Sequence, residues 1–350
     1  MLQIAYDITS LTESPFGGVA QTCYNTLLQA NNHPEIIPEA FYKTGDKKNF
    51  NISGIPTHKL SPFEPLFSRK YDIAHSLCHR RLKVKATRSI YTIYDVWSFY
   101  PNNYQSKDFQ KHVSKRLRKD IQKTDHIITI SNTTRNNLLA LEIIPPEKCS
   151  TVYLGVNFPS KKLSVFQNPN LSPILNKKYV LFVGCLENRK NIEHILNAVL
   201  PISNINLVLA GRSGFGYEEK IKKKLSEFPQ DRLCCINQIN RNDLTILYSN
   251  AVATILPSWE EGFGLPILEA MACACPVITS NCSANAEISG DSAILVNPEM
   301  PTESQQAIIK LLDNIQFRDS IIEKGLKRVK QFSWENYYNR VFDIYKKVLF

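Results

Sequence analysis

Residues 258–272 read Ser-Trp-Glu-Glu-Gly-Phe-Gly-Leu-Pro-Ile-Leu-Glu-Ala-Met-Ala, and this stretch says more about the fold than any other. Seven residues separate Glu261 from Glu269, with glycines at 262 and 264 and an apolar run after them. Glycine allows the backbone to approach a ligand closely, and Pro266 is typical of the first turn of a helix. The pattern predicts a loop that enters a helix, with one carboxylate before the helix and one inside it.

The start of this predicted helix is suited to an anion. Free backbone N–H groups of Gly264 and Leu265 would point ahead of the helix, where the helix dipole favours negative charge. Two carboxylates beside the same space suit hydroxyl groups, so the arrangement fits a sugar nucleotide. A simpler interpretation, a turn before a buried helix with two solvated carboxylates, also fits two glutamates at this spacing alone.

The complete string from Glu261 to Ala272 resembles the E-x7-E signature of family 4 glycosyltransferases. The resemblance implies an α/β protein with the GT-B fold, in which two Rossmann-like domains with parallel sheets face a central cleft, and it implies retaining transfer. It further implies that Glu261 contacts the donor sugar and stabilises developing oxocarbenium charge, while Glu269 holds the ribose hydroxyls. The backbone of Gly262, Phe263, Gly264 and Leu265 would hold the diphosphate.

A second cluster, Val183-Gly-Cys-Leu-Glu-Asn-Arg-Lys-Asn-Ile192, places two cations after an apolar strand. Cations at the carboxyl end of a parallel strand are well placed for a diphosphate. The segment resembles the phosphate motif of the family, which implies that Arg189 and Lys190 offset the charge of the leaving group. Many relatives have arginine where this chain has Cys185, so we expect Arg189 to carry more of that role.

The chain contains no Asp-x-Asp pair of the kind that holds Mg²⁺ or Mn²⁺ on a sugar nucleotide. Arg189, Lys190 and the helix start at Gly264 can take the place of that metal. We therefore expect transfer without a metal ion and without another cofactor.

Further donor contacts are expected from weaker motifs. A strand, a glycine turn and a helix at the N-terminus place Gly17 and Gly18 near a phosphate. Tyr91-Thr-Ile-Tyr-Asp-Val96 resembles a family segment with histidine at the position of Tyr94. Tyr94 and the adjacent Asp95 are therefore candidates for donor binding. Tyrosine can bind a hydroxyl or phosphate but is a poor base near neutral pH. The nucleotide base is expected near Gln238 and Ile239.

Two histidines are acceptor-side candidates. His75 and His79 follow an apolar strand in Asp72-Ile-Ala-His-Ser-Leu-Cys-His79. His75 matches a position common in the family. A hydrogen-bonded structural histidine is an equally good interpretation of His75, and the sequence leaves both open.

The order of strand and helix candidates predicts two doubly wound domains. We expect an acceptor-side domain over 1–158, a proline-containing linker over 159–177, a donor-binding domain over 178–332, and a helix over 333–350 that crosses back to the first domain. Ala274 stands where relatives usually have glycine, and we expect it to fit a backbone with negative φ.

Composition narrows the class of protein. A length of 350 residues suits two domains, and no apolar run reaches the roughly 18 residues that span a bilayer. The N-terminus lacks the features of a signal peptide, and the nine cysteines lack zinc-ligand spacing. These features predict a cytoplasmic protein with reduced, buried thiols.

The formal net charge of +10 favours anionic partners. Residues 107–123 combine seven Lys and Arg residues with an apolar residue at every fourth position. The pattern fits either a core-packed helix with a solvated basic face or a helix that docks on anionic lipid at the inner face of the membrane. Nucleic-acid binding also fits the charge, but the chain has no recognisable motif for it.

The pattern is similar to enzymes that extend bacterial lipopolysaccharide or O-antigen chains. We therefore expect a hexosyltransferase, with GDP-mannose as the favoured donor and a glycan or lipid-linked glycan as acceptor. The alternative is a catalytically impaired subunit that binds sugar nucleotides, which Tyr94 and Cys185 suggest. Intact Glu261, Glu269 and the two cations argue against that alternative.

Overall fold

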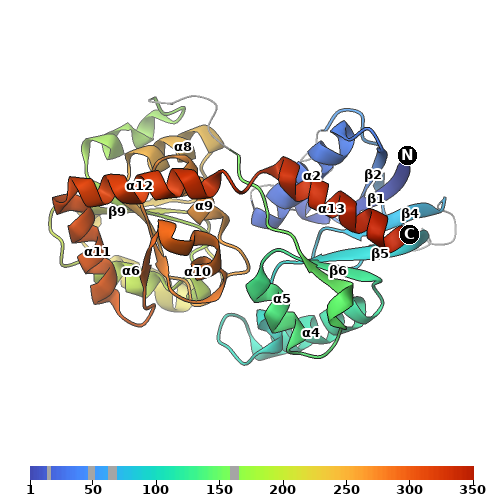
Figure 1. Ribbon diagram of the computed structural model, residues 1–350. Coiled ribbons are helices and arrows are strands. Elements are labelled where there is room, and N and C mark those ends of the chain that lie inside the picture. Colours follow the sequence, from blue (N-terminus) through green and yellow to red (C-terminus); the bar gives the residue numbers. More distant parts are fainter. Residues whose placement is uncertain (14–16, 46–51, 62–68, 158–164) are drawn as a thin grey trace. The chain divides into compact units, whose positions relative to one another are not determined.

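The computed structural model describes residues 1–13, 17–45, 52–61, 69–157 and 165–350 (Figure 1). Contacts divide the chain into two compact units. The first comprises Met1–Phe99, Lys111–Gly155 and Phe332–Phe350, and the second comprises Tyr100–Gln110 and Val156–Gln331. Each unit is built around its own parallel sheet.

The first unit contains a seven-stranded sheet in the order β3-β2-β1-β4-β5-β6-β7. Its central strands are buried along most of their length, as expected for parallel strands covered on both faces. The strands are β1 (Leu2–Asp7), β2 (Ile36–Tyr42), β3 (Thr57–Lys59), β4 (Tyr71–Ser76), β5 (Ala86–Ile93), β6 (His126–Thr129) and β7 (Cys149–Thr151).

The helices of the first unit connect these strands, and one of them comes from the C-terminus. They are α1 (Thr9–Glu13), α2 (Gly18–Asn32), α4 (Lys107–Gln122), α5 (Asn132–Leu139) and α13 (Trp334–Leu349), with short 3-10 turns η2 (Trp97–Phe99) and η3 (Pro146–Lys148). The C-terminal helix α13 lies beside α2, where Thr26 Oγ1 donates to the Tyr337 hydroxyl at 3.2 Å (Figure 1). Ser333 caps α13 by accepting from the Asn336 N–H at 3.0 Å, as the sequence predicts.

The second unit contains a six-stranded sheet in the order β10-β9-β8-β11-β12-β13. Its strands are β8 (Tyr179–Val183), β9 (Asn206–Ala210), β10 (Leu233–Ile236), β11 (Ala253–Leu256), β12 (Val277–Ser280) and β13 (Ile294–Val296). The order reverses between β8 and β11, which are neighbours in the sheet although β9 and β10 separate them in the chain. Such a reversal is the place where open α/β sheets bind ligands, at the carboxyl ends of the strands.

Helices also separate the strands of the second unit. They are α6 (Ile192–Val199), α7 (Lys222–Glu227), α8 (Arg241–Asn250), α9 (Leu265–Ala272), α10 (Ser283–Ser289), α11 (Pro301–Asp313) and α12 (Ile315–Val329), with short turns η4 (Pro169–Asn176), η5 (Asn188–Lys190), η6 (Tyr217–Ile221), η7 (Gln230–Arg232) and η8 (Gly290–Ser292). The predicted parallel, doubly wound architecture is confirmed for both sheets. In the described chain, no helix is both long and apolar enough to cross a membrane.

Several expectations fail in detail. The sequence pattern does not predict the strands β2, β3 and β13. Residues 159–164 of the expected linker lie outside the described residues. All nine cysteines are free, and the expectation that they are buried is confirmed for Cys23, Cys78, Cys149 and Cys275. Four others are half-buried, and Cys235 on the edge strand β10 is exposed, so the expectation is wrong there.

Candidate active site

The candidate site of the second unit lies at the reversal of strand order. The loop after β8 carries Arg189 and Lys190, and the loop after β11 carries Glu261. The two loops are bonded together, because the Trp259 N–H donates to the Arg189 carbonyl at 3.0 Å. The sheet therefore brings together side chains that are 71 and 72 positions apart in the sequence.

Glu261 is held between two cations. Its Oε2 accepts from Arg189 Nη1 at 2.9 Å, and its Oε1 accepts from Lys190 Nζ at 2.5 Å. The Glu261 and Lys190 side chains are each 11% exposed, and that of Arg189 is 20% exposed. Exclusion of water strengthens the Coulomb attraction within these pairs, although burial of the charges also costs their hydration.

This surrounding changes the acidity of Glu261. Burial alone would raise its pKa, but the nearby charges of Lys190 and Arg189 outweigh burial and lower the pKa to about 2. The carboxylate is therefore ionised throughout the physiological range. An ionised carboxylate can stabilise positive charge on a sugar, and it cannot serve as a proton donor.

The loop after β8 is itself held in place. Arg189 also donates to the Glu187 carboxylate at 2.7 Å and to the Glu260 carbonyl at 2.6 Å. Asn191 takes a left-handed conformation with φ of 55° and donates to the Pro257 and Pro298 carbonyls. Cys185 lies half-buried in this loop. The position of Arg189 depends on several bonds and not on Glu261 alone.

The helix α9 begins as the sequence predicts, with Gly264 before it and Pro266 in its first turn. Gly264 has φ of 93°, a left-handed conformation that favours glycine. A side chain here would come within 2.9 Å of Ile267 Cδ1 and 3.0 Å of Asn285 Oδ1. The sequence therefore needs glycine at 264, and the backbone can approach a ligand there.

The second glutamate of the signature lies inside α9. Glu269 Oε2 accepts from the Tyr248 hydroxyl at 3.1 Å. Burial raises the pKa of Tyr248, and the neighbouring Glu269 charge raises it further. Tyr248 thus remains a hydrogen-bond donor that orients Glu269.

Some residues of the site were not predicted from the sequence. Ser283 Oγ accepts from the Glu261 N–H at 3.1 Å, so α10 supports the Glu261 loop. Asn285 Nδ2 donates to Ser280 Oγ at 2.9 Å below the same loop. Both lie on α10, which follows β12 in the chain, but only three-dimensional proximity reveals their role. Gln238 and Ile239, the candidates for base binding, follow β10 at the same carboxyl edge of the sheet; Gln238 is exposed and Ile239 half-buried.

The first unit holds the remaining donor candidates. Gly17 precedes α2 as its N-cap residue, and Gly18 is the first residue of that helix. The Tyr94 hydroxyl donates to the Leu77 carbonyl at 2.8 Å, and its pKa is raised by burial. Asp95 follows, half-buried. The Tyr94 hydroxyl is therefore engaged with the backbone of its own unit.

The two acceptor-side histidines differ. His75 is fully buried, with its Nδ1 2.6 Å from the Tyr345 hydroxyl and its Nε2 2.8 Å from Thr92 Oγ1. Burial lowers the pKa of His75 to about 3, so the ring is neutral. Both nitrogens are used inside the unit, which favours the structural interpretation. His79 is exposed, with its ring centroid 6.4 Å from that of Tyr94.

The expectation for Ala274 is wrong. Its φ is 56°, not negative. The Cys275 N–H donates to the Ala270 carbonyl and the Ala274 N–H to the Met271 carbonyl. These two bonds form a Schellman motif, whose C′ residue is left-handed and usually glycine. Alanine here is strained because the helix end requires that conformation.

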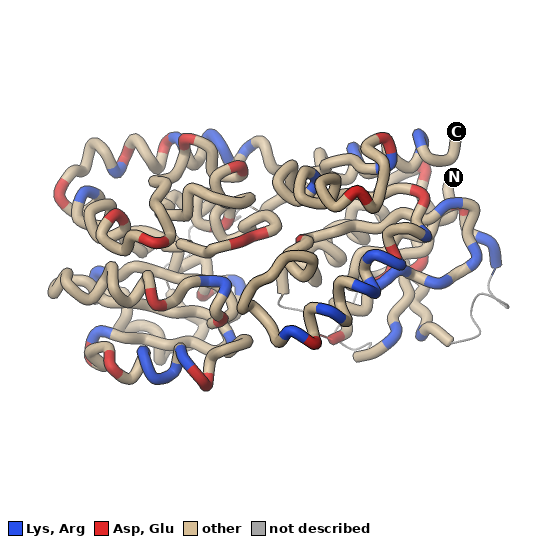
Figure 2. The backbone as a smooth tube through the Cα atoms, turned by 90° about the horizontal axis from the view of Figure 1, so that it is seen from below, with Lys and Arg blue, Asp and Glu red and all other residues tan. Residues whose placement is uncertain are grey.

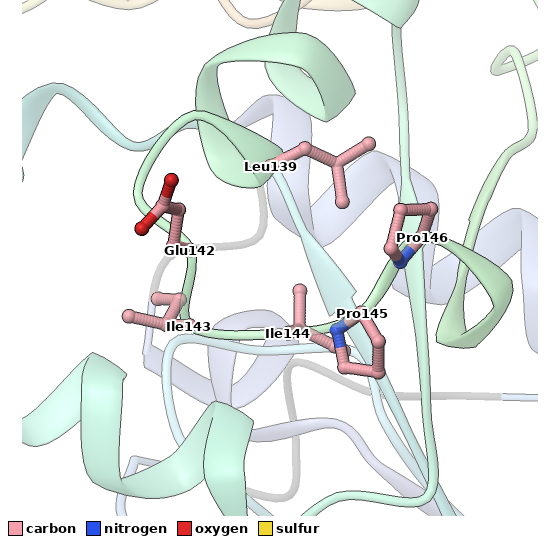
Figure 3. A pocket seen from close by; sticks show the side chains of 6 residues that line it. All are labelled: Leu139, Glu142, Ile143, Ile144, Pro145 and Pro146. Carbon is pink, nitrogen blue, oxygen red and sulfur yellow. The ribbon is translucent and has the colours of Figure 1, made fainter.

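A separate hollow of about 520 Å³ lies in the first unit after α5 (Figure 3). Its lining is mainly apolar, and it contains none of the predicted site residues. The lining residues are Leu139, Glu142, Ile143, Ile144, Pro145 and Pro146. Because a sugar nucleotide needs several converging polar groups, this hollow is not the candidate active site.

Comparisons with known proteins agree with this geometry. A protein-family model described as glycosyl transferases group 1 matches residues 167–328. A second family model, described as glycosyltransferase family 4, matches residues 56–158. The O-antigen chain mannosyltransferase B of Escherichia coli is 30% identical over 273 residues, which cover 74% of this chain and 70% of that protein. The O-antigen chain mannosyltransferase RfbU of Salmonella typhimurium is 28% identical over 249 residues, covering 70% of this chain and 65% of the relative.

Among solved structures, HepE of Anabaena in complex with UDP-glucose matches with a TM-score of 0.79 at 14% identity, covering 99% of this chain and all of that one. At this identity the likeness shows the fold alone, and the fold is GT-B. Fold and sequence together define a glycosyltransferase. The chain belongs to family 4 of the glycosyltransferases.

Proposed function

We propose that this enzyme transfers a sugar from a nucleotide-sugar donor, with retention of configuration and without a metal ion. The acceptor would be a lipid-linked glycan or oligosaccharide of the cell surface. The observation that carries the proposal is the Glu261 carboxylate, which is ionised, shielded from water and held by Lys190 and Arg189 in front of α9.

The proposed reaction exchanges one bond at the anomeric carbon for another. The bond from the sugar to the diphosphate breaks, the acceptor oxygen bonds to the same face of the sugar, and its proton passes to the leaving phosphate. Glu261 stabilises the positive charge that develops on the sugar. Arg189, Lys190 and the start of α9 offset the negative charge of the diphosphate.

The cations that would hold the diphosphate are bonded to Glu261 in the ligand-free chain. A bound diphosphate would share or take over these donors. The Arg189 guanidinium, with its five N–H groups, can serve two acceptors at once. This arrangement supports donor binding without a metal ion, because two positive charges already face the expected phosphates.

GDP-mannose is the favoured donor, because two relatives are named as O-antigen mannosyltransferases. The structural match to HepE in complex with UDP-glucose supports testing UDP-sugars beside it. In the proposed setting the enzyme works in the cytoplasm, as a peripheral protein at the inner face of the membrane.

A donor panel tests the proposal. The purified chain is incubated with GDP-, UDP-, dTDP- and ADP-sugars and a chelator, and both donor binding and release of nucleoside diphosphate are measured. We expect binding and slow hydrolytic release from one class of donor. Loss of release with chelator and its return with Mn²⁺ would contradict the metal-independent mechanism, and absence of binding to every donor would contradict the function.

A second candidate function rests on Tyr94. Its hydroxyl is bonded to the Leu77 carbonyl at the position where relatives have histidine. A subunit that binds sugar nucleotides without transferring them would show donor binding but no release, even with acceptor glycans present. Restoration of transfer in Tyr94→His would assign the defect to this residue.

A further inference from the structure

A group of uncharged residues lies beside the candidate site and takes no part in the chemistry proposed above. The second unit includes Tyr100–Gln110, which the chain reaches before the rest of that unit. This segment starts with Tyr100-Pro-Asn-Asn-Tyr-Gln-Ser106, in which no side chain is charged. Lys and Arg gather instead along α4, which begins at Lys107 (Figure 2). Hydroxyl, amide and aromatic groups without net charge suit a neutral ligand rich in hydroxyls better than an anion.

The segment is anchored on the loop that carries Arg189. Asn188, the residue before it, donates from Nδ2 to the Asn103 carbonyl at 3.4 Å. The Asn188 side chain lies against Gly216, where an added Cβ would come within 2.5 Å of it. The loop after β9 therefore limits the positions open to Asn188, and Asn188 joins the segment to the candidate site.

The turn around Tyr104 is held by side-chain hydrogen bonds. The Tyr104 N–H donates to Asn102 Oδ1 at 2.9 Å. The buried Gln110 donates from Nε2 to the Asn102 carbonyl at 3.0 Å and to the Gln105 carbonyl at 2.9 Å. Tyr104 is therefore presented on a turn that is already ordered in the ligand-free chain.

The half-buried Tyr104 side chain lies near the charged groups of the candidate site. Burial raises the pKa of Tyr104, and the charge of Glu260 raises it further, whereas the charge of Arg189 lowers it. Cys282, the N-cap residue of α10, is a third neighbour of the phenol. The Tyr104 ring therefore lies beside both the loop that holds Glu261 and the loop that holds Arg189.

Trp259 is held on the Glu261 loop by its backbone. Its N–H donates to the Arg189 carbonyl at 3.0 Å, and its carbonyl accepts from Cys282 Sγ at 3.5 Å. Its indole side chain is 37% exposed, two positions before Glu261. Cys282 neighbours Trp259 and Tyr104 alike, so the two residues belong to one cluster. Aromatic rings on ordered loops offer a preorganised contact surface for a ligand.

The proposed reaction indicates which ligand meets these rings. In transfer with retention, the acceptor oxygen approaches the face of the sugar from which the diphosphate leaves. The acceptor therefore lies beside the groups that hold the diphosphate, and Arg189, next to Trp259 and Tyr104, is one of them. A pyranose ring presents a face of C–H groups with weak positive charge, which packs on the negative face of an aromatic ring.

We propose that Trp259 and Tyr104 form a subsite that binds the pyranose ring of the acceptor. The enzyme then recognises its acceptor by a sugar next to the reacting hydroxyl, and no lipid is needed for this contact. The inference rests on the proposed function, because a sugar-transferring site is what brings an acceptor beside Arg189. Packing on an aromatic face depends little on the pattern of hydroxyl groups, so several pyranosides should bind.

Ligand-detected NMR tests the subsite. Saturation-transfer difference spectra of the full chain are recorded with the methyl α-glycosides of mannose and glucose, with methyl β-galactoside, and with glycerol. We expect signals from the pyranosides, strongest for the C–H protons of one ring face, and none from glycerol, which has hydroxyls but no ring. The spectra are repeated on Glu261→Gln saturated with the donor that it binds, and the pyranoside signals should persist.

Paired substitutions separate the two rings from the fold. Trp259→Leu and Tyr104→Leu each remove a ring and should weaken pyranoside binding by about tenfold. Trp259→Tyr and Tyr104→Phe keep a ring at the same position and should retain most of the affinity. The matched control is Phe109→Leu, which removes a 48% exposed ring from the same segment and should leave pyranoside binding unchanged.

Three results would overturn the proposal. The first is the absence of a signal from every pyranoside. The second is unchanged pyranoside affinity in both leucine variants. The third is loss of the signals when donor is bound, which would assign the rings to the donor sugar. Release of nucleoside diphosphate tests the proposed function separately: a chain that binds pyranosides through the two rings but releases nothing from any donor would contradict transfer and not the sugar subsite.

Discussion

At the scale of single residues, Glu261 is the centre of the candidate site. Its two oxygens bond Arg189 and Lys190, and its N–H bonds Ser283 Oγ. In the proposed mechanism the same cations hold the diphosphate, and in the ligand-free site they are oriented by pairing with the Glu261 carboxylate. The negative charge of Glu261 offsets the repulsion between the buried cations Arg189 and Lys190. The same pairing holds the loops after β8 and β11 together.

The lowered pKa of Glu261 predicts a dependence of stability on pH. With its pKa lowered to about 2, the ionised carboxylate contributes stability that is complete above the unfolded value of 4.5 and is lost as the pH falls toward 2. The difference in unfolding free energy between the unmodified chain and Glu261→Gln should therefore shrink by about 1.4 kcal/mol between pH 6 and pH 3.5. Urea unfolding at both pH values measures it; a constant difference would show that the ion pairs are not formed.

The strained Ala274 predicts a stabilising substitution. An L-residue in the left-handed region costs about 1–2 kcal/mol, part of which is offset because glycine loses more entropy on folding. Ala274→Gly should therefore raise the unfolding free energy of the second unit by about 0.5–1 kcal/mol. Ala272→Gly, inside α9, is the control and should lower it. A destabilising effect of Ala274→Gly would mean that the Schellman motif is not present.

At the scale of elements, α13 is fixed to the first sheet by buried hydroxyl groups. Tyr345 lies between His75 on β4 and Tyr6 on β1, and Tyr6 also bonds the Tyr338 hydroxyl at 2.8 Å. Thr92 on β5 completes the chain at His75 Nε2. These bonds specify one position of the helix, since a shift of α13 would leave several buried polar groups without partners.

The removal of one hydroxyl tests this attachment. Tyr345→Phe leaves the Nδ1 of His75 without its bond and should lower the unfolding free energy of the first unit by about 1–3 kcal/mol. Tyr24→Phe on the exposed side of α2 is the matched control and should change it by less than about 0.5 kcal/mol. Equal effects of the two substitutions would show that α13 is held by apolar packing alone.

Local patterns in the sequence predict the helices and strands more accurately than they predict the contacts between these elements. The start of α9 follows from Gly264 and Pro266, and the cap of α13 from Ser333, because each signal acts within a few residues. The hydrogen bond at His75 Nδ1 joins it to Tyr345, 270 positions away, and the pairing of Glu261 with Arg189 and Lys190 depends on the order of β8 and β11. Neither relation leaves a mark in the local sequence. The left-handed conformation of Ala274 is imposed by the end of α9, so the residue type alone does not predict it.

At the scale of the whole molecule, charge and proposed chemistry lie in different units. The net charge resides in residues 80–88 and 111–123 of the first unit, while Glu261, Arg189 and Lys190 belong to the second. Substitutions in these segments and at Glu261 therefore test the proposed membrane attachment and the proposed sugar transfer separately. The family shows the class of reaction.

The most direct test of the central claim compares the unmodified chain with Glu261→Gln. Both are supplied with the donor that the panel selects and a chelator, and release of nucleoside diphosphate is measured beside donor affinity. We predict that Glu261→Gln lowers release by about 10²–10³-fold, as expected for loss of one electrostatic group at the reacting centre, while it binds the donor at least as tightly because the Glu261 carboxylate no longer competes with the diphosphate for Arg189 and Lys190. Near-normal release by Glu261→Gln would contradict the account.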